Sequence, residues 1–287
     1  MKRMTIVAVL AMAVILGMSA RASAIAVIGN AFTLVDGDSE VSIDPDSSAG
    51  AKSWTFGGKD YLAQQWFWFR TEADGVYDDR EYSIDEISGP AVDHVDPAVA
   101  TITYADANVE AKVTYALADE AGPSGGSTLV ETVIFTNKTG GSMKLYLFQY
   151  SDFELGGTAD DMKVEILNGN LAKQTDTPAA SVVILSETVV TSIPAGTPVS
   201  EVDMTGATLA KLMDANVNVL DGSTLLNGPG DLTWAFQWTL DIPSGQALLL
   251  SKIKDITIKQ DGGGIVPEPA GLGLMAAALL TLRRRRR

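Results

Sequence analysis

The chain has 287 residues, no cysteine, one histidine and a formal net charge of −15. The lack of cysteine excludes disulfides, thiolate metal sites and cysteine catalysis. With a single histidine, a metal would need oxygen ligands, which favours calcium or magnesium over zinc, and the acidic balance argues against nucleic acid and anionic lipid as partners.

Residues 1–24 have the pattern of a secretory signal peptide. A basic beginning precedes an apolar core over 4–18, and the small residues Ala22 and Ala24 stand at the positions that a signal peptidase reads. We therefore expect an N-terminal signal helix that is removed after Ala24. An uncleaved anchor is the alternative, because Arg21 lies close to the cut.

Residues 25–259 read as a single β domain, since no hydrophilic linker or repeat of fixed period divides them. Strands are expected at 31–35 and 41–43, around an acidic turn. Five carboxylates there have partly the spacing of a calcium loop, but the later glycine and glutamate of an EF-hand are missing. A solvated acidic loop is therefore favoured, with calcium as the alternative. The five are Asp36, Asp38, Glu40, Asp44 and Asp46.

An aromatic strand follows at 64–70, after a hairpin expected over 53–62 around Gly57-Gly58. Trp66 and Trp68 should point to one side of this strand and phenylalanines to the other, so it should be central and covered on both faces. Core packing is the favoured role of the two tryptophans. Contact with sugar rings, which stack on tryptophan, is the alternative, and it makes Trp66 and Trp68 candidate carbohydrate contacts.

Alternating apolar and polar residues predict further strands along the rest of the body, at 99–104, 109–117, 129–136, 143–150, 164–167, 171–174 and 181–190. The loop 137–142 suits antiparallel neighbours, and Asn137, although it matches a glycosylation sequon, reads as a turn residue. One helix is expected over 205–215, with Leu209, Leu212 and Met213 on a shared face.

The last strands are the clearest. The stretch 233–240 places its large aromatics on one face, and a partner strand is expected after the turn 243–245, over 248–251 with extension to 258. We expect this aromatic face to pack against the Trp66 strand. The predicted fold is an all-β antiparallel sandwich of a dozen or more strands with one short helix, flanked by an N-terminal signal helix and a C-terminal hydrophobic helix.

A Gly-rich spacer, 260–265, leads to a distinct terminal segment, 266–287. This segment consists of Pro267-Glu268-Pro269, an apolar run over 270–282 and five arginines. The prolines keep Glu268 extended and accessible, as a peptidase substrate must be. The apolar run is shorter than the roughly 20 residues of a full membrane span. A buried terminal helix with a solvated basic end is the plainer alternative.

The order of these three parts resembles the PEP-CTERM sorting signal of Gram-negative bacteria. The resemblance implies processing by a membrane-embedded exosortase-type peptidase at Pro267, Glu268 and Pro269. It also implies transient contact of both termini with the inner membrane, and export to the cell surface or extracellular matrix. The stretches 54–70, 148–155 and 234–238 resemble those of a group of PEP-CTERM proteins, a resemblance that implies no activity. Without the eight basic residues and one acid of the two terminal segments, the formal charge becomes −22.

Motifs of catalysis are missing. The sequence contains no Walker loop, Gly-x-Ser-x-Gly elbow or His-Glu-x-x-His, and the lone His94 lies between turn acids, where a structural role is favoured. We therefore predict a non-catalytic protein that associates with exopolysaccharide, without a cofactor other than the calcium alternative. The second hypothesis is a polysaccharide hydrolase or lyase on a β-sandwich, with Arg70, Asp152 and Glu154 converging in a groove.

Overall fold

The computed structural model describes residues 30–120, 125–155, 161–176, 181–190, 198–204 and 206–260. The predicted signal peptide, the sorting signal and all of the spacer except its first residue lie outside the described residues. None of the helices in the described part is long and apolar enough to cross a membrane.

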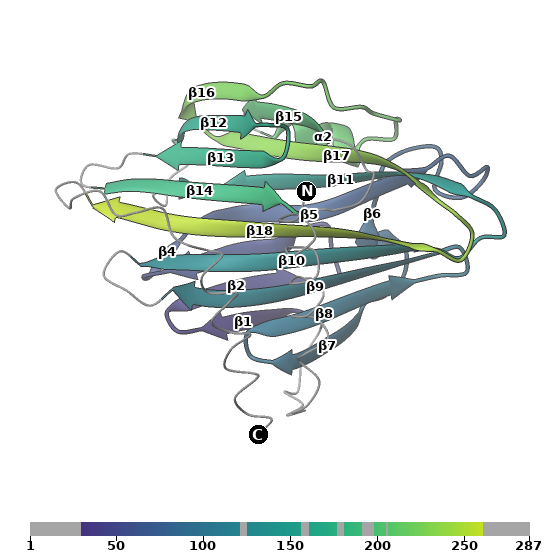
Figure 1. Cartoon of the computed structure of the whole chain (residues 1–287), viewed down its shortest axis with the longest axis horizontal. Coiled ribbons are helices and arrows are strands. Elements are labelled where there is room, and N and C mark those ends of the chain that lie inside the picture. The colour runs from purple at the N-terminus through teal and green to yellow at the C-terminus, as the bar shows by residue number, and fades with distance from the viewer. Residues whose placement is uncertain are drawn as a thin grey trace, which may run out of the picture.

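The body consists of two nine-stranded sheets stacked face to face (Figure 1). Sheet 1 has the order β1-β2-β3-β5-β11-β17-β15, with β4 and β6 paired at its side. Its strands are β1 (Phe32–Asp36), β2 (Ser39–Asp44), β3 (Gly50–Phe56), β4 (Lys59–Asp60), β5 (Leu62–Thr71), β6 (Tyr82–Ser83), β11 (Met143–Phe153), β15 (Val199–Met204) and β17 (Leu232–Ile242).

Sheet 2 has the order β16-β12-β13-β14-β18-β10-β9-β8-β7. Its strands are β7 (Ala91–Asp96), β8 (Val99–Ala105), β9 (Val109–Glu120), β10 (Gly126–Asn137), β12 (Asp161–Leu167), β13 (Leu171–Asp176), β14 (Ser181–Val189), β16 (Leu225–Gly230) and β18 (Ala247–Gln260). Pairing is antiparallel apart from a short parallel contact of β3 with β5. The predicted antiparallel sandwich of a dozen or more strands is confirmed.

The one predicted α-helix is also present, as α2 (Ala207–Met213), and a 3-10 turn, η1 (Ile84–Glu86), follows β6. Leu212 is fully buried, as its place on the expected apolar face requires, and Leu209 packs partly against the core. Met213, four residues after Leu209 at the end of the helix, is 57% exposed, so the apolar face is buried only as far as Leu212.

Strand β5 is central and covered on both faces, as predicted. Phe67 and Phe69 point into the space between the sheets, where Phe69 meets Phe135 of sheet 2 at a centroid distance of 5.2 Å. Trp66 points the other way, and its indole N–H donates to Ser83 Oγ at 3.0 Å. Gly50 has a φ of +57°, and a Cβ there would stand 2.0 Å from Trp66 Cε3, so the close approach of β3 to β5 requires glycine.

Two predicted pairings are wrong. Strands β10 and β11 lie in different sheets, because β10 pairs with β9 and β18 whereas β11 pairs with β5 and β17. Strand β17 likewise does not pair with β18, and it lies in the same sheet as β5 rather than packed against it. The short loops after β10 and β17 therefore arch from one sheet to the other, the second of them at the right-hand end in Figure 1.

The two arches are tied together by Asn137, the fully buried last residue of β10. Its side-chain amide donates to Gly141 O and to Ile242 O, both at 2.8 Å. Its backbone N–H donates to Gln246 O at 3.0 Å, and its carbonyl accepts from Gly245 N at 2.9 Å. The sequon asparagine is thus a buried structural residue where β10 meets its turn, in agreement with the interpretation of this segment as a turn.

The inner face of β17 is heavily apolar, as predicted. Trp234 stacks on Phe153 at 5.4 Å, and Phe236 and Trp238 lie beside each other at 5.7 Å, all of them essentially unexposed. The opposite face of β17 is buried as well: Thr233 and Gln237 are 0% and 3% exposed. Sheet 1 is therefore covered on both sides along its central strands, by sheet 2 on the inside and by chain segments on the outside.

Candidate functional site

The candidate sugar contacts Trp66 and Trp68 lie on the outer face of sheet 1. Strand register brings Trp68 opposite Phe148 of β11, and Phe148 in turn opposite Gln237 of β17, all on this face. Trp66 is 0% exposed and Trp68 is 1% exposed. A glycan in solution cannot reach either ring in this structure, and core packing, the favoured of the two predicted roles, describes both tryptophans.

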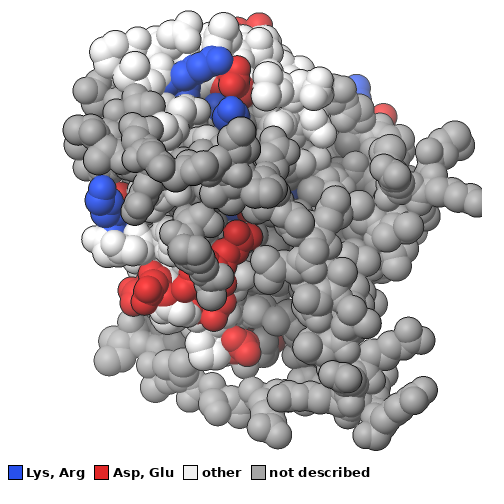
Figure 2. All heavy atoms as spheres, turned by 60° about the vertical axis from the view of Figure 1, so that its left-hand side comes forward, with Lys and Arg blue, Asp and Glu red and all other residues white. Residues whose placement is uncertain are grey.

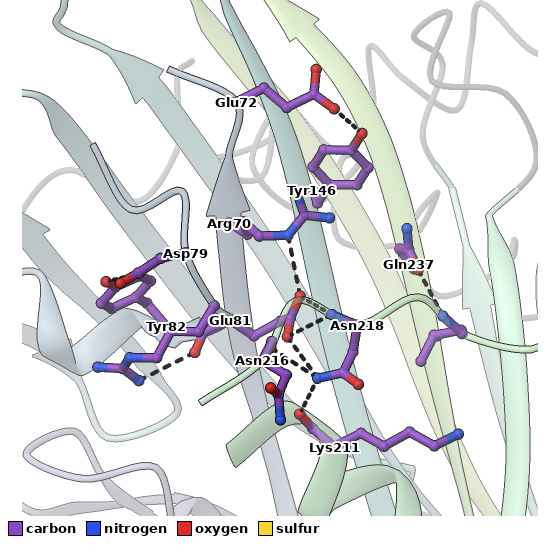
Figure 3. Close-up of polar contacts among 12 residues, drawn as sticks. Arg70, Glu72, Asp79, Glu81, Tyr82, Tyr146, Lys211, Asn216, Asn218 and Gln237 are labelled. Carbon is purple, nitrogen blue, oxygen red and sulfur yellow. Dashed lines mark hydrogen bonds and ion pairs between the residues drawn. The ribbon is translucent and has the colours of Figure 1, made fainter. Parts of the chain in front are cut away.

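An ion pair holds the covering segments in place (Figure 3). Arg70 Nε lies 3.2 Å from Glu81 Oε1, and the two side chains are 7% and 0% exposed. Glu81 also accepts from the backbone N–H of Asn218 at 3.0 Å and from its side-chain amide at 3.1 Å. The segment between β5 and η1 and the segment after α2 are thus joined over the sheet. Arg70, predicted as a groove residue, serves instead in this buried contact.

Beside this ion pair lie three partly exposed tyrosines, Tyr77, Tyr82 and Tyr146, which we call the tyrosine rim. Figure 3 shows Tyr82 and Tyr146 on either side of the Arg70–Glu81 pair, and Tyr77 meets Tyr82 at a centroid distance of 4.9 Å. Each hydroxyl donates to a carboxylate: Tyr77 to Asp106 at 3.0 Å, Tyr82 to Asp79 at 2.5 Å, and Tyr146 to Glu72. Tyr82 is opposite the inward-pointing Phe69, and Tyr146 is opposite the outward-pointing Arg70. The rings therefore lie on the two faces of sheet 1 at the end of β5, each held by its hydrogen bond.

Two arginines complete the rim. The guanidinium carbon of Arg70 lies 3.9 Å from the centroid of Tyr146, and that of Arg80 lies 4.0 Å from the centroid of Tyr82. Such cation–π contacts occupy one face of a ring and reduce its freedom to rotate. Glu72 pairs with Lys144 at 3.1 Å, and both of these side chains are well exposed. The rim thus presents rigid aromatic rings next to solvent-accessible hydrogen-bonding groups.

Hydrogen bonds and burial keep the tyrosines of the rim and Glu72 in one protonation state near neutral pH. The hydrogen bond from Tyr146 lowers the pKa of Glu72, and the same bond raises the pKa of Tyr146. Burial, followed by the hydrogen bond to Asp106, raises the pKa of Tyr77 to about 12. The phenols stay protonated and Glu72 stays ionised, so none of these groups exchanges a proton readily at pH 7. The arrangement suits binding better than acid–base catalysis.

Sequence reasoning missed the rim because Tyr77 and Tyr82 lie in an irregular, charge-rich segment without strand periodicity. The usable signal was composition: isolated aromatics among acids and arginines in a loop belong at a surface. The carbohydrate contact was predicted at Trp66 and Trp68 because of their large rings, although an aromatic run with strand spacing favours the core.

A second cluster contains the other two predicted groove residues. Burial, and then the charges of Asp231 and Glu154, raise the pKa of Asp152 to about 7, and Asp152 accepts from the Tyr150 hydroxyl at 3.3 Å. Arg70 is opposite Tyr146 in β11, whereas Asp152 is opposite Gln64. Six residues of strand separate the two positions, about 20 Å at 3.4 Å per residue. Asp152 and Glu154 are therefore brought together, and Arg70 is not with them.

The predicted acidic loop and the lone histidine have local roles. Asp36 accepts from the backbone N–H of Asp119 at 2.9 Å, and Asp119 accepts from that of Asp38 at 2.8 Å, which joins the β1–β2 turn to the end of β9. Within the described ranges, no group of three or more acidic or histidine side chains is placed to hold a metal ion. His94 is half-buried against Phe32, at a centroid distance of 5.3 Å.

Among the described residues on the face drawn in Figure 2, acidic side chains gather in the lower part of the view, and most of the basic side chains lie apart from them. A surface of this kind repels polyanions at low ionic strength.

Comparison with known proteins identifies structures of similar fold but no family. No family model and no curated protein matches the chain. Among solved structures, a bacterial glucoamylase complexed with acarbose has a TM-score of 0.52 at 10% identity; the match covers 92% of this chain and 38% of the glucoamylase. A galactose mutarotase related enzyme from Lactobacillus acidophilus has a TM-score of 0.46 at 8% identity, covering 82% of this chain and 100% of that one.

A polysaccharide lyase has a TM-score of 0.45 at 15% identity, and the match covers 78% of this chain and 33% of the lyase. At such identities a likeness shows the fold alone. The chain is thus a two-sheet antiparallel β-sandwich, a fold that it shares with the matched part of the glucoamylase.

Proposed function

We propose that the chain is an exported bacterial protein of the cell surface or extracellular matrix that binds exopolysaccharide through the tyrosine rim without cleaving it. The observation that carries the proposal is the set of three partly exposed tyrosines, each hydrogen-bonded to a carboxylate. Aromatic rings stack on the apolar faces of sugars, and neighbouring carboxylates accept hydrogen bonds from sugar hydroxyls. Fixed rings lose little conformational entropy on binding.

Export rests on the two terminal segments. A signal peptide over 1–24 would direct the chain across the inner membrane, and an exosortase-type peptidase would act at Pro267-Glu268-Pro269. Deletion of 266–287 in the producing organism should release the protein from the matrix into the medium. Equal retention with and without this segment would contradict the sorting part of the proposal and leave the glycan-binding part to be judged separately.

Glycan binding can be tested by co-sedimentation of the purified protein with the producing organism's own exopolysaccharide, with reducing ends measured in the same tubes. We expect binding without release of reducing ends. Loss of one stacking ring removes roughly 1 kcal/mol, so Tyr82→Ala and Tyr146→Ala should each weaken binding by about fivefold to tenfold. Leu225→Ala, which alters an exposed apolar residue on sheet 2, is the matched control and should bind normally. A variant that combines Tyr82→Ala with Tyr146→Ala and still binds as well as wild type would refute the role of the rim.

A polysaccharide hydrolase or lyase is the second candidate, and Asp152 is the observation in its favour. A carboxyl with a pKa of about 7 beside Asp231 and Glu154 is suited to proton transfer at neutral pH. In this case reducing ends or unsaturated ends would appear in the incubation, and Asp152→Asn would abolish them. Release that persists in Asp152→Asn would exclude this residue as the proton donor.

A further inference from the structure

Four charged side chains lie together between the two sheets. Lys252 and Lys254 of β18, Glu131 of β10 and Glu187 of β14 are all 0% exposed. Lys252 Nζ lies 2.7 Å from Glu131 Oε2 and 3.6 Å from Glu187 Oε1, and Lys254 Nζ lies 2.5 Å from Glu131. Burial of paired ions in a core rarely adds stability over apolar residues of similar volume. Stability alone therefore does not explain why these four charged side chains are buried, and we considered what reaction they could carry out.

Gln149 of β11, on the facing sheet, reaches into this cluster. Its carbonyl Oε1 accepts a hydrogen bond from Lys252 Nζ, and its Nε2 donates to Glu187 Oε2 at 3.0 Å and to Ser151 Oγ at 2.9 Å. Gln149 is 1% exposed, and the ring of Phe67 closes another side, with its centroid 4.4 Å from Lys252 Nζ. An amine, an amide and two carboxylates thus share a site from which bulk water is excluded.

The amine of Lys252 is suited to act as a nucleophile. Burial lowers the pKa of Lys252 to about 8, against the opposing effect of Glu131, so its uncharged form is more accessible than that of an ordinary lysine. Glu131, 2.7 Å away, is within hydrogen-bond reach to take the proton. The carbon under attack, Cδ of Gln149, is one bond from the oxygen that Lys252 already contacts.

We propose that Lys252 and Gln149 form an intramolecular amide bond, an isopeptide cross-link, which joins sheet 2 covalently to sheet 1. The ammonium of Lys252 first gives one proton to Glu131. The neutral Nζ then attacks Cδ of Gln149, forming the C–N bond and placing negative charge on Oε1. A second proton passes from Nζ to Glu187, which accepts a hydrogen bond from the leaving Nε2.

Glu187 transfers that proton to Nε2, the bond from Cδ to Nε2 breaks, and ammonia departs. Of the three ammonium protons, one remains on the new amide, one leaves in ammonia and one stays on Glu131. The site holds two positive and two negative charges before the reaction. Afterwards it holds Lys254 as the cation and Glu187 as the anion, so it remains neutral. No oxidant, metal or cofactor is required, and no atom changes oxidation state.

The consequence is a covalent tie in a chain that contains no cysteine. The two residues are 103 positions apart in the sequence, on strands of opposite sheets. A cross-link that closes so long a loop restricts the unfolded chain strongly, as a disulfide would, but no reducing agent can open it. This inference is independent of the proposed function and of the tyrosine rim.

Mass spectrometry of the purified full chain tests the proposal. The cross-linked protein should be lighter than its own sequence by one ammonia, about 17 Da. Trypsin cannot cut after an acylated Lys252, so the digest should contain the peptide 145–163 joined to the peptide 212–254. On a denaturing gel without reducing agent, the linked chain should migrate ahead of an unlinked variant.

Three variants make the result decisive. Lys252→Met should show the full sequence mass and the slower mobility. Glu187→Gln keeps both reacting groups but loses the proton relay, and should slow formation of the link by at least tenfold. Gln65→Asn changes an equally buried glutamine of neighbouring β5 and should keep the link.

The near-ultraviolet circular dichroism of the buried tryptophans shows whether the wild-type protein is folded. If folded wild-type protein retains the full mass and yields two separate peptides, the proposal is wrong. A bond mapped from Lys252 to Glu131 or Glu187 with loss of water instead of ammonia would overturn it as well.

Discussion

The buried pair between Arg70 and Glu81 supports a quantitative prediction about the cover over sheet 1. Glu81 is fully buried and accepts hydrogen bonds from Arg70 and from the backbone and side-chain amides of Asn218. The substitution Glu81→Ala removes all of these acceptors at once. It leaves the guanidinium of Arg70 buried without its counterion and the Asn218 N–H without its partner.

The size of the effect follows from this geometry. Removing one partner of a buried ion pair costs about 3–5 kcal/mol, because the remaining charge stays desolvated. For a domain of 150–250 residues, 1 kcal/mol corresponds to about 2–4 °C in Tm, so Glu81→Ala should lower Tm by about 6–20 °C. Replacing both partners, in Arg70→Met with Glu81→Leu, should recover much of this loss, since no unpaired charge remains.

Urea unfolding followed by tryptophan fluorescence would measure these differences, because five tryptophans are buried in the sandwich. Lys52→Ala is the matched control. Lys52 pairs with Asp44 at 3.6 Å with side chains 47% and 28% exposed, and an exposed pair contributes at most about 1 kcal/mol. A Glu81→Ala variant as stable as Lys52→Ala would refute the reasoning, as would a double variant that is less stable than Glu81→Ala.

Three further predictions concern other parts of the sandwich. The pKa of Asp152 rises from 3.8 to about 7 on folding, so its stabilising protonated form is lost as pH rises towards 7. Asp152→Asn, measured by urea unfolding, should therefore gain stability over wild type at pH 8 and show little difference at pH 3.5. Asn137→Ala leaves two arch carbonyls without donors and should cost about 2–4 kcal/mol, whereas Ser244→Ala, at an exposed arch residue, should cost less than about 1 kcal/mol. Gly50→Ala should yield little folded protein, because its Cβ would lie 2.0 Å from the Trp66 ring, while Gly57→Ala, with a φ of +59° but open space around it, should cost only about 1–2 kcal/mol in thermal unfolding.

Local periodicity was enough to find most strands and their buried faces. The alternation over 109–117 appears as β9 with every second residue buried, and the double aromatic pattern of β5 correctly indicated a strand covered on both sides. Both properties depend on the two-residue period of a strand, which the sequence displays directly. The hairpin around Gly57-Gly58 was found as well, since Thr55 and Phe56 pair with Asp60 and Lys59 across a tight turn.

Pairing across the arches could not be read in the same way. The loops 138–142 and 243–246 have lengths that suit hairpins, yet each carries the chain from one sheet to the other. What separates an arch from a hairpin here is the buried amide of Asn137, which bonds to Ile242, a residue more than a hundred positions away. A contact of such sequence separation leaves no periodic trace in either segment.

The sequence by itself determined the fold class of this protein and the burial of its aromatic strands. These follow from composition and from patterns that repeat within a few residues. Only the tertiary structure decided which strands are neighbours, that Trp66 and Trp68 are covered, that the exposed aromatics are tyrosines held by carboxylates, and that Lys252 meets Gln149 between the sheets. Those facts depend on long-range packing, in which side chains from distant strands exclude water together, and no local pattern encodes that.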